Sequence, residues 1–190
     1  MTWVRTDDGG ARGDRQAGTV LVGSPLGSLQ QAFRLASEPT LTSLQGRFQA
    51  TIAGPSWVRL PALLVVHVTG MPGWWGKEFA VDERGDALMG HNVVMAGDAL
   101  YASLPMRAVL GCSRTDGRPA LVLTYGSDAG WPWRRVTDEV RSLNDGTLIG
   151  LSFGLPLPPG GSPFLLRPDS TGRAPTRRRP STPTTPGGAS

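Results

Sequence analysis

Alternation of apolar and polar residues with a period of two constrains this chain most strongly. Residues 44–52 alternate in this way, as do residues 89–95, 121–125 and 147–153. A period of two is typical of strands that bury one face. Turn sequences rich in Gly, Asp and Asn separate these segments. Short strands joined by tight turns predict an antiparallel meander.

Helical periodicity stands out in one short segment near the N-terminus. Within residues 28–36, the apolar residues Leu29, Ala32, Phe33 and Ala36 recur at the spacing of one helix face. The pattern of residues 56–70 is compatible with either a strand or a helix. Their valines favour a strand, whereas residues 60–64 are compatible with the start of a helix.

A long antiparallel meander has to protect its edge strands, and closure into a barrel does so. We therefore predict an all-β fold, a single antiparallel up-and-down, lipocalin-like β-barrel of about eight strands with a short N-terminal helix. Barrels of this size either fill their interior with side chains or hold one small ligand. Both alternatives stay open at this point.

Composition sets the expected limits of the folded part. Residues 1–18 are polar and Gly-rich, and residues 168–190 are rich in Pro, Thr, Arg and Gly, so we predict two disordered ends around a barrel of residues 19–167. The five arginines and one aspartate from Arg167 onward account for the whole net charge of +4. The neutral remainder offers no electrostatic surface for nucleic acid, and we expect the Arg-rich tail to be passive.

The chain carries no pattern that directs it to a membrane. Residues 2–16 lack the basic and apolar regions of a signal peptide. The longest apolar runs fall short of the roughly 20 residues that a membrane helix needs. We therefore predict a cytoplasmic protein without a membrane span, and we leave open whether it forms a homodimer.

Paired tryptophans between glycines indicate the wall of a cavity. Trp74 and Trp75 stand at a predicted strand start, Trp131 falls in a predicted loop, and Trp133 begins a predicted strand of residues 133–143. Loops and strand starts form the mouth of a barrel, where indole rings can stack on a ligand. The alternative is that these rings only plug the barrel. We predict a ligand-binding set of aromatic and apolar side chains: Trp74, Trp75, Trp131, Trp133, Phe48 and Met89.

Three patches of the chain resemble the bacterial family named for a GxWxG motif and its companion domain of unknown function. Residues 44–48 resemble the opening L-x-G-x-W, with Phe48 in place of the tryptophan, and residues 73–79 resemble the W-x-G-K-x-F block. Residues 125–167 resemble the remaining motifs, with departures at Gly126 and Val140. The resemblance implies a calycin-type barrel, similar in outline to lipocalins and fatty-acid-binding proteins. It implies no settled reaction.

Asp138 is the first candidate for chemistry. It alternates with Val136 and Val140 on one strand face, so we expect its carboxylate to point into the barrel, where loss of water favours the protonated acid and suits it to proton transfer. A buried carboxylate needs a partner. Arg134 lies too far along the strand, so the partner is expected from another strand. A structural salt bridge is the alternative.

Two further residues join Asp138 as catalytic candidates. His91 lies between Met89 and Val93 on what we interpret as an apolar face, and Tyr125 ends an apolar strand. Tyr125 can donate a hydrogen bond to a ligand carbonyl or can lie at the barrel rim. A satisfied core histidine is the alternative for His91. Only one other histidine, His67, is present, so we predict no metal site.

The motifs of cofactor chemistry are missing from the sequence. It contains no Gly-rich phosphate loop in the right context, no G-x-S-x-G and no H-E-x-x-H. We predict no cofactor. Two functions from different classes remain: binding of an apolar, aromatic or polyketide-like molecule in the cavity, or cofactor-free catalysis. The enzyme would be a cyclase, a Diels-Alderase-like pericyclase or an isomerase that holds a natural-product intermediate in a reactive shape.

Overall fold

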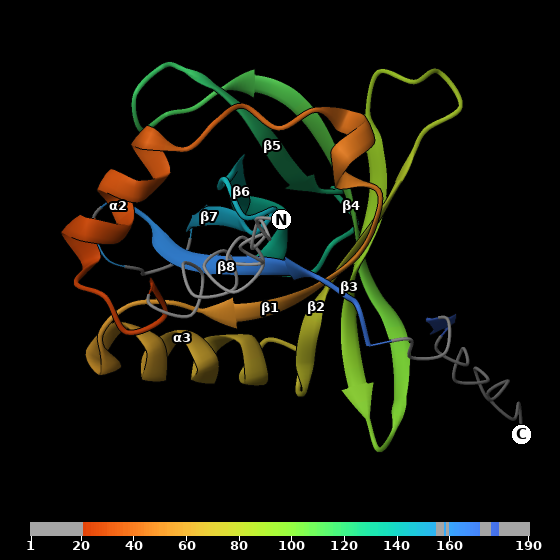
Figure 1. Cartoon of the computed structure of the whole chain (residues 1–190). Coiled ribbons are helices and arrows are strands. Elements are labelled where there is room, and N and C mark those ends of the chain that lie inside the picture. Colours follow the sequence, from red (N-terminus) through yellow and green to blue (C-terminus); the bar gives the residue numbers. More distant parts are fainter. Residues whose placement is uncertain (1–20, 155–157, 159, 172–175, 179–190) are drawn as a thin grey trace, which may run out of the picture.

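The chain folds into a closed antiparallel β-barrel with two short α-helices, which confirms the predicted fold class. The structure is a computed structural model that describes residues 21–154, 158, 160–171 and 176–178. Each barrel strand pairs with its neighbours in sequence, and β8 pairs with β1, so that the described strands form one continuous ring (Figure 1). The barrel strands are β1 Gly46–Ile52, β2 Trp74–Val81, β3 Leu88–Ala96, β4 Ala99–Cys112, β5 Pro119–Tyr125, β6 Thr137–Ser142, β7 Leu148–Phe153 and β8 Ser162–Pro168.

Much of the barrel interior is filled by apolar side chains, which stand at every second position along the strands. The ring of Phe48 packs edge-on against that of Phe79, with centroids 6.1 Å apart. The other members of this core come from nearly every strand, because inward positions recur every second residue. They include Leu88, Met106, Leu121, Leu123, Val140, Leu148 and Leu166, and Leu44 joins them from the 3-10 helix η1 Leu41–Leu44.

The first described helix, α2 Leu26–Leu35, covers the outside of the barrel. Leu29 and Phe33 are fully buried there against Ile149 and Leu165, which point outward from β7 and β8. The helix lies where the apolar spacing of residues 28–36 predicts it. Its burial explains why β7 and β8 are apolar on both faces, since each face has a covering layer.

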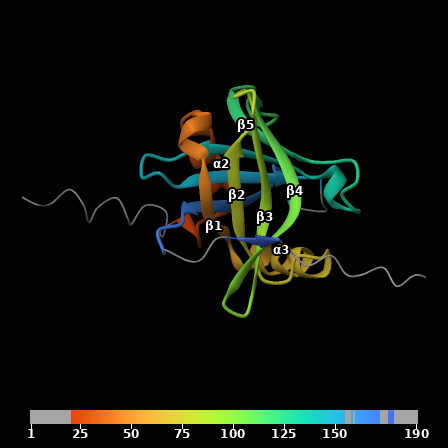
Figure 2. The same cartoon turned by 90° about the vertical axis from the view of Figure 1, so that its right-hand side faces the viewer.

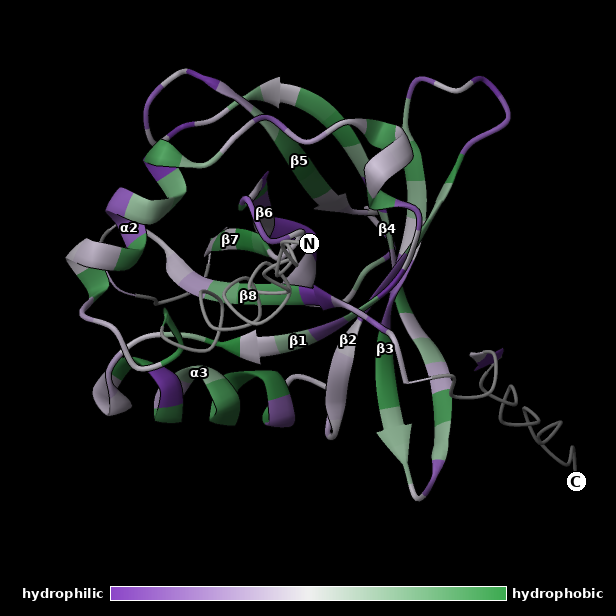
Figure 3. Cartoon of the chain, viewed as in Figure 1, coloured by the Kyte–Doolittle hydropathy of each residue, from purple (hydrophilic) through white to green (hydrophobic). Residues whose placement is uncertain are grey.

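A second helix, α3 Ser56–Val68, settles the ambiguous segment. Val58 and Ala62 are buried on its barrel side, and this contact overrides the strand preference of its valines. Most residues of α3 are apolar, with polar residues interspersed, as the green and purple segments of its ribbon show in Figure 3. The side opposite the barrel exposes Trp57, Leu60, Leu63, Leu64 and Val68. No helix in the described ranges has the length and hydropathy that crossing a membrane would require.

An irregularity in β2 changes which residues enter the barrel. Trp74 pairs with Val94, whereas Gly76 pairs with Val93, so the register shifts between Trp74 and Gly76. Such a bulge resets the alternation of side chains. Trp74 and Lys77 therefore both point inward although they are three residues apart. A Cβ at Gly76 would collide with the carbonyl oxygen of Phe48, so the close approach of β1 requires glycine here.

Ordered contacts continue past residue 167, where we predicted the barrel to end. Arg47 forms a 2.8 Å ion pair with Asp169. A short strand, β9 Arg177–Arg178, pairs in parallel with Tyr101 and Ala102 of β4. Figure 2 shows β1 to β4 side by side on this part of the barrel. The predicted disordered segment of residues 1–18 and most of the tail lie outside the described residues.

Candidate functional site

A cavity of about 50 Å³ lies inside the barrel at the end that α3 covers. A water molecule needs roughly 10–15 Å³ on this measure, so the cavity has room for a few waters. A larger guest requires side chains or α3 to move. The wall is mainly apolar, and its apolar members are Ile52, Ala62, Val65, Val66, Met71, Trp74, Trp133, Val136, Pro163 and Phe164.

A buried ion pair crosses the barrel beside this cavity. Lys77 comes from β2 and Asp138 from β6, two strands on opposite sides of the ring. The Lys77 Nζ lies 2.9 Å from Asp138 Oδ2, and the two residues are 1% and 2% exposed. The long lysine side chain spans the barrel interior and meets a carboxylate that it could not reach along one strand. Asp138 thus has the partner from another strand that the sequence predicts.

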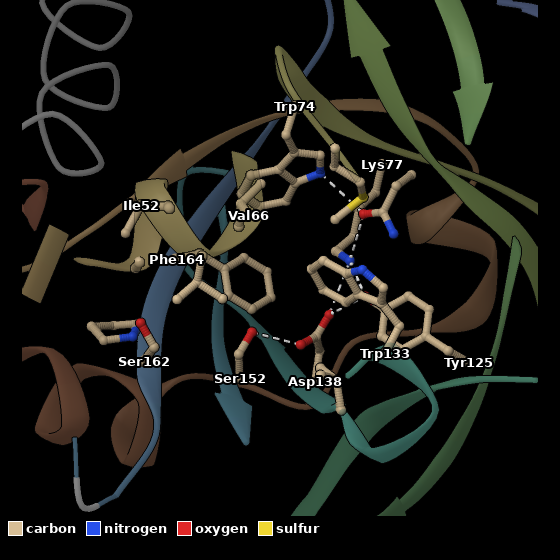
Figure 4. A pocket seen from close by; sticks show the side chains of 16 residues that line it. Ile52, Val66, Trp74, Lys77, Tyr125, Trp133, Asp138, Ser152, Ser162 and Phe164 are labelled. Atoms are coloured by element: carbon tan, nitrogen blue, oxygen red, sulfur yellow. Dashed lines mark hydrogen bonds and ion pairs between the residues drawn. The ribbon is translucent and has the colours of Figure 1, made fainter. Parts of the chain in front are cut away.

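Three more polar residues complete a set that we call the Lys77–Asp138 network: Lys77, Asn92, Tyr125, Asp138 and Ser152. The Tyr125 hydroxyl donates to Asp138 Oδ2 at 2.8 Å, and Ser152 Oγ donates to Asp138 Oδ1 at 2.6 Å. Lys77 Nζ donates to Tyr125 Oη at 2.8 Å and to Asn92 Oδ1 at 3.1 Å. Figure 4 shows Lys77, Tyr125, Asp138 and Ser152 converging at one side of the cavity.

Strand register places the members of this network in pairs. Lys77 lies directly opposite Asn92 on β2 and β3, and Asp138 lies directly opposite Ser152 on β6 and β7. Opposite residues on one sheet face are close enough to interact. Tyr125, at the end of β5, joins the two pairs across the interior. Five different strands therefore contribute to one site.

Aromatic rings surround the ammonium group. Lys77 Nζ lies 5.4 Å from the Tyr125 ring centroid and 5.8 Å from the centroids of Trp74 and Phe164. Cation–π attraction at these distances favours the charged form. Burial lowers the pKa of Lys77, but Asp138 and Tyr125 raise it by more, so the pKa lies above its ordinary value of 10.5. Lys77 is therefore an ammonium ion at neutral pH.

The Tyr125 phenol is held in its neutral form. Burial and then the negative charge of Asp138 raise its pKa to about 12, and Lys77 offsets this only in part. The unfolded chain would release this proton near 10.0, whereas the folded chain keeps it until about 12. The free energy of unfolding therefore falls as the pH rises through this interval, because the folded state binds the extra proton.

A spectroscopic titration tests this raised pKa. The chain has two tyrosines, Tyr101 and Tyr125, so a Tyr101→Phe variant reports on Tyr125 alone through the near-ultraviolet absorbance of tyrosinate. We expect a midpoint of about 12. The Tyr125→Phe variant is the control and should lack this step. A midpoint near the ordinary value of 10.0, in a protein still folded by circular dichroism, would contradict the burial of this phenol in the network.

The structure brings four of the predicted site residues to the cavity: Trp74, Trp133, Tyr125 and Asp138. The Trp133 indole packs edge-on against Tyr125 and donates a 2.8 Å hydrogen bond to the carbonyl oxygen of Thr69, at the end of α3. It sits on η2 Trp133–Arg135, a 3-10 helix rather than the strand that we predicted to begin there. Phe48 points inward but belongs to the packed core and does not line the cavity.

Two predicted residues of β3 lie on the wrong side for a role in the cavity. Met89 is 48% exposed, and His91 Nε2 lies 3.3 Å from Glu78 Oε2 on the barrel exterior. In β3, apolar residues occur at both the odd-numbered and the even-numbered positions. A period of two therefore did not show which of the two sets of side chains points into the barrel. The inward set is the one that contains Leu88 and Asn92.

Two predicted tryptophans also lie away from the cavity. Trp75 points outward from β2 and packs against Val93 and Leu100, beneath the guanidinium of Arg47 at 5.9 Å. Adjacent strand residues face opposite ways, so Trp74 and Trp75 cannot share one wall. Trp131 is 68% exposed in the loop before η2 and does not line the cavity.

Sequence reasoning missed three of the five residues of the Lys77–Asp138 network, namely Lys77, Asn92 and Ser152, and it also missed the ring of Phe164 in the cavity wall. One signal could have found Lys77. It is the single lysine of a sequence whose other basic residues, apart from two histidines, are all arginines. The bulge in β2 hid its direction, because strict alternation from an inward Trp74 places position 77 outside. The described residues contain no cluster of three or more His, Cys, Asp or Glu that could hold a metal ion.

Comparisons with known proteins bear on the fold alone. No family model matches the chain, and no curated protein matches it either. The barrel is similar to the crystal structure of a protein from Thermomonospora curvata, with a TM-score of 0.59 and 15% identity over 82% of this chain and 97% of that chain. The resemblance to the GxWxG-motif family stays a prediction, as does the cytoplasmic location, and the question of a homodimer stays open.

Proposed function

We propose that this protein binds a small, mainly apolar or aromatic molecule in the barrel cavity. The observation that carries this proposal is a buried, hydrogen-bonded ion pair in the wall of an otherwise apolar cavity. An apolar pair of similar volume often gives a fold equal or greater stability. Perturbed titratable groups in a concave site are typical of functional sites. A few placed polar groups in an apolar wall are the usual composition of a small-molecule site.

The ligand's apolar part would pack between Trp74, Trp133 and Phe164, and its polar part would face the Lys77–Asp138 network. The cavity of about 50 Å³ favours a compact guest over a polyketide-sized one. Entry requires an opening, and α3 is the element that covers this end with few buried residues, chiefly Val58 and Ala62. Elements with few buried contacts open at the lowest cost.

A filled-cavity variant tests the proposal. Ala62 lines the cavity from α3, and Ala62→Phe should occupy the space and weaken binding of one-ring and two-ring aromatic probes by about tenfold or more. Leu64→Phe is the matched control, because Leu64 is 62% exposed on the outer side of the same helix. Binding is measured by quenching of tryptophan fluorescence. Equal affinities of Ala62→Phe and the parent chain would refute binding in this cavity.

One observation favours catalysis as the second candidate function. Hydrogen bonds connect Ser152, Asp138, Tyr125 and Lys77 without a break along the cavity wall. A cofactor-free cyclase, pericyclase or isomerase needs little more than such fixed donors and a shaped cavity. Incubation with linear polyene precursors should then give a product of unchanged mass and new retention time. Asp138→Asn, assayed under conditions in which circular dichroism shows it to be folded, should retain binding and lose turnover. Tight binding without conversion would count against this candidate.

A further inference from the structure

The ammonium group of Lys77 has no hydrogen left for a ligand. An ammonium carries three N–H donors. These meet Asn92 Oδ1 at 3.1 Å, Tyr125 Oη at 2.8 Å and Asp138 Oδ2 at 2.9 Å. The charged atom that would be the obvious anchor for an anionic ligand is thus already saturated by its neighbours.

The side-chain amide of Asn92 is different, because it carries a buried donor without a partner. Its Oδ1 accepts from Lys77 Nζ at 3.1 Å and from Trp74 Nε1 at 3.0 Å. Turning the amide over would set its NH₂ group against these two donors, so the orientation is fixed by the network. Among the described residues, Asn92 Nδ2 has no hydrogen-bond partner although the residue is fully buried.

Tyr125 is a candidate partner within the network, because hydrogen bonding from the Asn92 side chain is the smallest of the causes that shift the pKa of Tyr125, after burial, Asp138 and Lys77. No hydrogen bond of acceptable geometry joins Asn92 Nδ2 to the phenol oxygen. An unsatisfied buried donor costs free energy until an acceptor reaches it.

The charge of the site is balanced before any ligand enters. Among the residues that line the cavity, Lys77 and Asp138 carry the formal charges, and these are opposite. A charged guest would add an uncompensated charge to a buried, mainly apolar space, which is costly. The network therefore disfavours carboxylates as well as amines.

We infer that the cavity selects an uncharged, apolar ligand with a carbonyl-type oxygen, such as a ketone, ester, amide or quinone, and that this oxygen accepts a hydrogen bond from Asn92 Nδ2. The inference rests on the proposed function and names its ligand class. The hydrogen bond would satisfy the one buried donor that the described wall leaves unpaired. Satisfying such a donor should improve affinity by about tenfold.

Three matched one-ring probes separate these effects by fluorine NMR: para-fluoroacetophenone, para-fluoroethylbenzene and para-fluorobenzoate. The ketone and the hydrocarbon differ little in shape, and only the ketone has an acceptor. The benzoate has acceptors and a negative charge. We expect the ketone to bind about tenfold more tightly than the hydrocarbon, and the benzoate to bind most weakly.

The variant Asn92→Asp removes the donor. An aspartate at this position still accepts from Lys77 and Trp74, but it replaces the free NH₂ group by an oxygen. We expect the preference for ketone over hydrocarbon to disappear. Asn144→Asp is the matched control, because Asn144 is an exposed residue of the β6–β7 turn, and it should keep the preference. If Asn92→Asp does not fold, the ranking of the three probes on the parent chain decides.

The outcomes distinguish this inference from the function on which it rests. Equal affinity for ketone and hydrocarbon, or tightest binding of the benzoate, would overturn the inference and leave cavity binding intact. Failure of all three probes to bind would contradict the proposed function itself, and the inference with it.

Discussion

Replacing Lys77 by methionine should destabilise the protein by about 3–5 kcal/mol, the usual effect of removing one partner of a buried ion pair. Methionine fills a similar volume, so packing loss contributes little. The Asp138 carboxylate would remain 2% exposed without its counter-charge. Asn92 and Tyr125 would lose the hydrogen bonds that Lys77 donates to them. Urea unfolding followed by circular dichroism measures the free energy of unfolding.

A double-mutant cycle controls for the individual side chains. Asp138→Asn alone leaves the ammonium group of Lys77 without its carboxylate, so it should also destabilise the chain strongly. The double variant Lys77→Met with Asp138→Asn removes both charges, and we expect it to be less destabilised than the two single losses added together. A loss below about 1 kcal/mol for Lys77→Met would match an exposed ion pair and would contradict the buried network.

The second large effect is expected at Arg141. Its replacement by methionine should lower the free energy of unfolding by about 3–5 kcal/mol. Arg141 is fully buried on the outward phase of β6. Its guanidinium donates two hydrogen bonds to Asp116, at 2.8 and 2.6 Å, and one to the carbonyl oxygen of Phe33 at 3.1 Å. It also lies 4.6 Å from the Phe33 ring centroid. One side chain thus joins α2, β6 and the β4–β5 turn.

Detachment of α2 should accompany this loss of stability. Hydrogen exchange of the α2 amides should accelerate in Arg141→Met more than exchange in β1 or β2. Arg107→Met is the matched control, because Arg107 is exposed on β4, and a change within about 0.5 kcal/mol is expected there. Uniform acceleration of hydrogen exchange across the barrel would show that Arg141 stabilises the whole fold rather than the attachment of α2 to the barrel.

The stability of the protein in acid is a second test of the contact between Arg141 and Asp116. Hydrogen bonds from Arg141 are the main reason that the pKa of Asp116 falls from 3.8 to about 2. A lowered folded-state pKa contributes stability that is present above the unfolded value and is lost as the pH falls towards the folded value. The parent chain should lose this contribution between about pH 4 and pH 2. In Arg141→Met most of that pH dependence should be absent, since the main cause of the shift is gone.

Local patterns in the sequence were sufficient for much of the fold. The period of two and the turn sequences predict an antiparallel meander, and the need to protect edges predicts its closure. The same reasoning places Asp138 and Val140 on the inward face of β6, because that strand has no bulge, and Val136 on the same side directly before it. It also shows that Asp138 needs a partner from another strand. These inferences succeed because each depends on residues that are neighbours along one strand.

The site depended on contacts that no single strand encodes. The bulge between Trp74 and Gly76 turns Lys77 inward, and the closed ring sets β2 opposite β6, so Lys77 meets Asp138. The choice between the two apolar phases of β3 puts Asn92 inside and His91 outside. Pairing register and bulges follow from packing among strands distant in sequence. The alternation therefore determined that a barrel forms, and tertiary packing decided which polar residues share its interior.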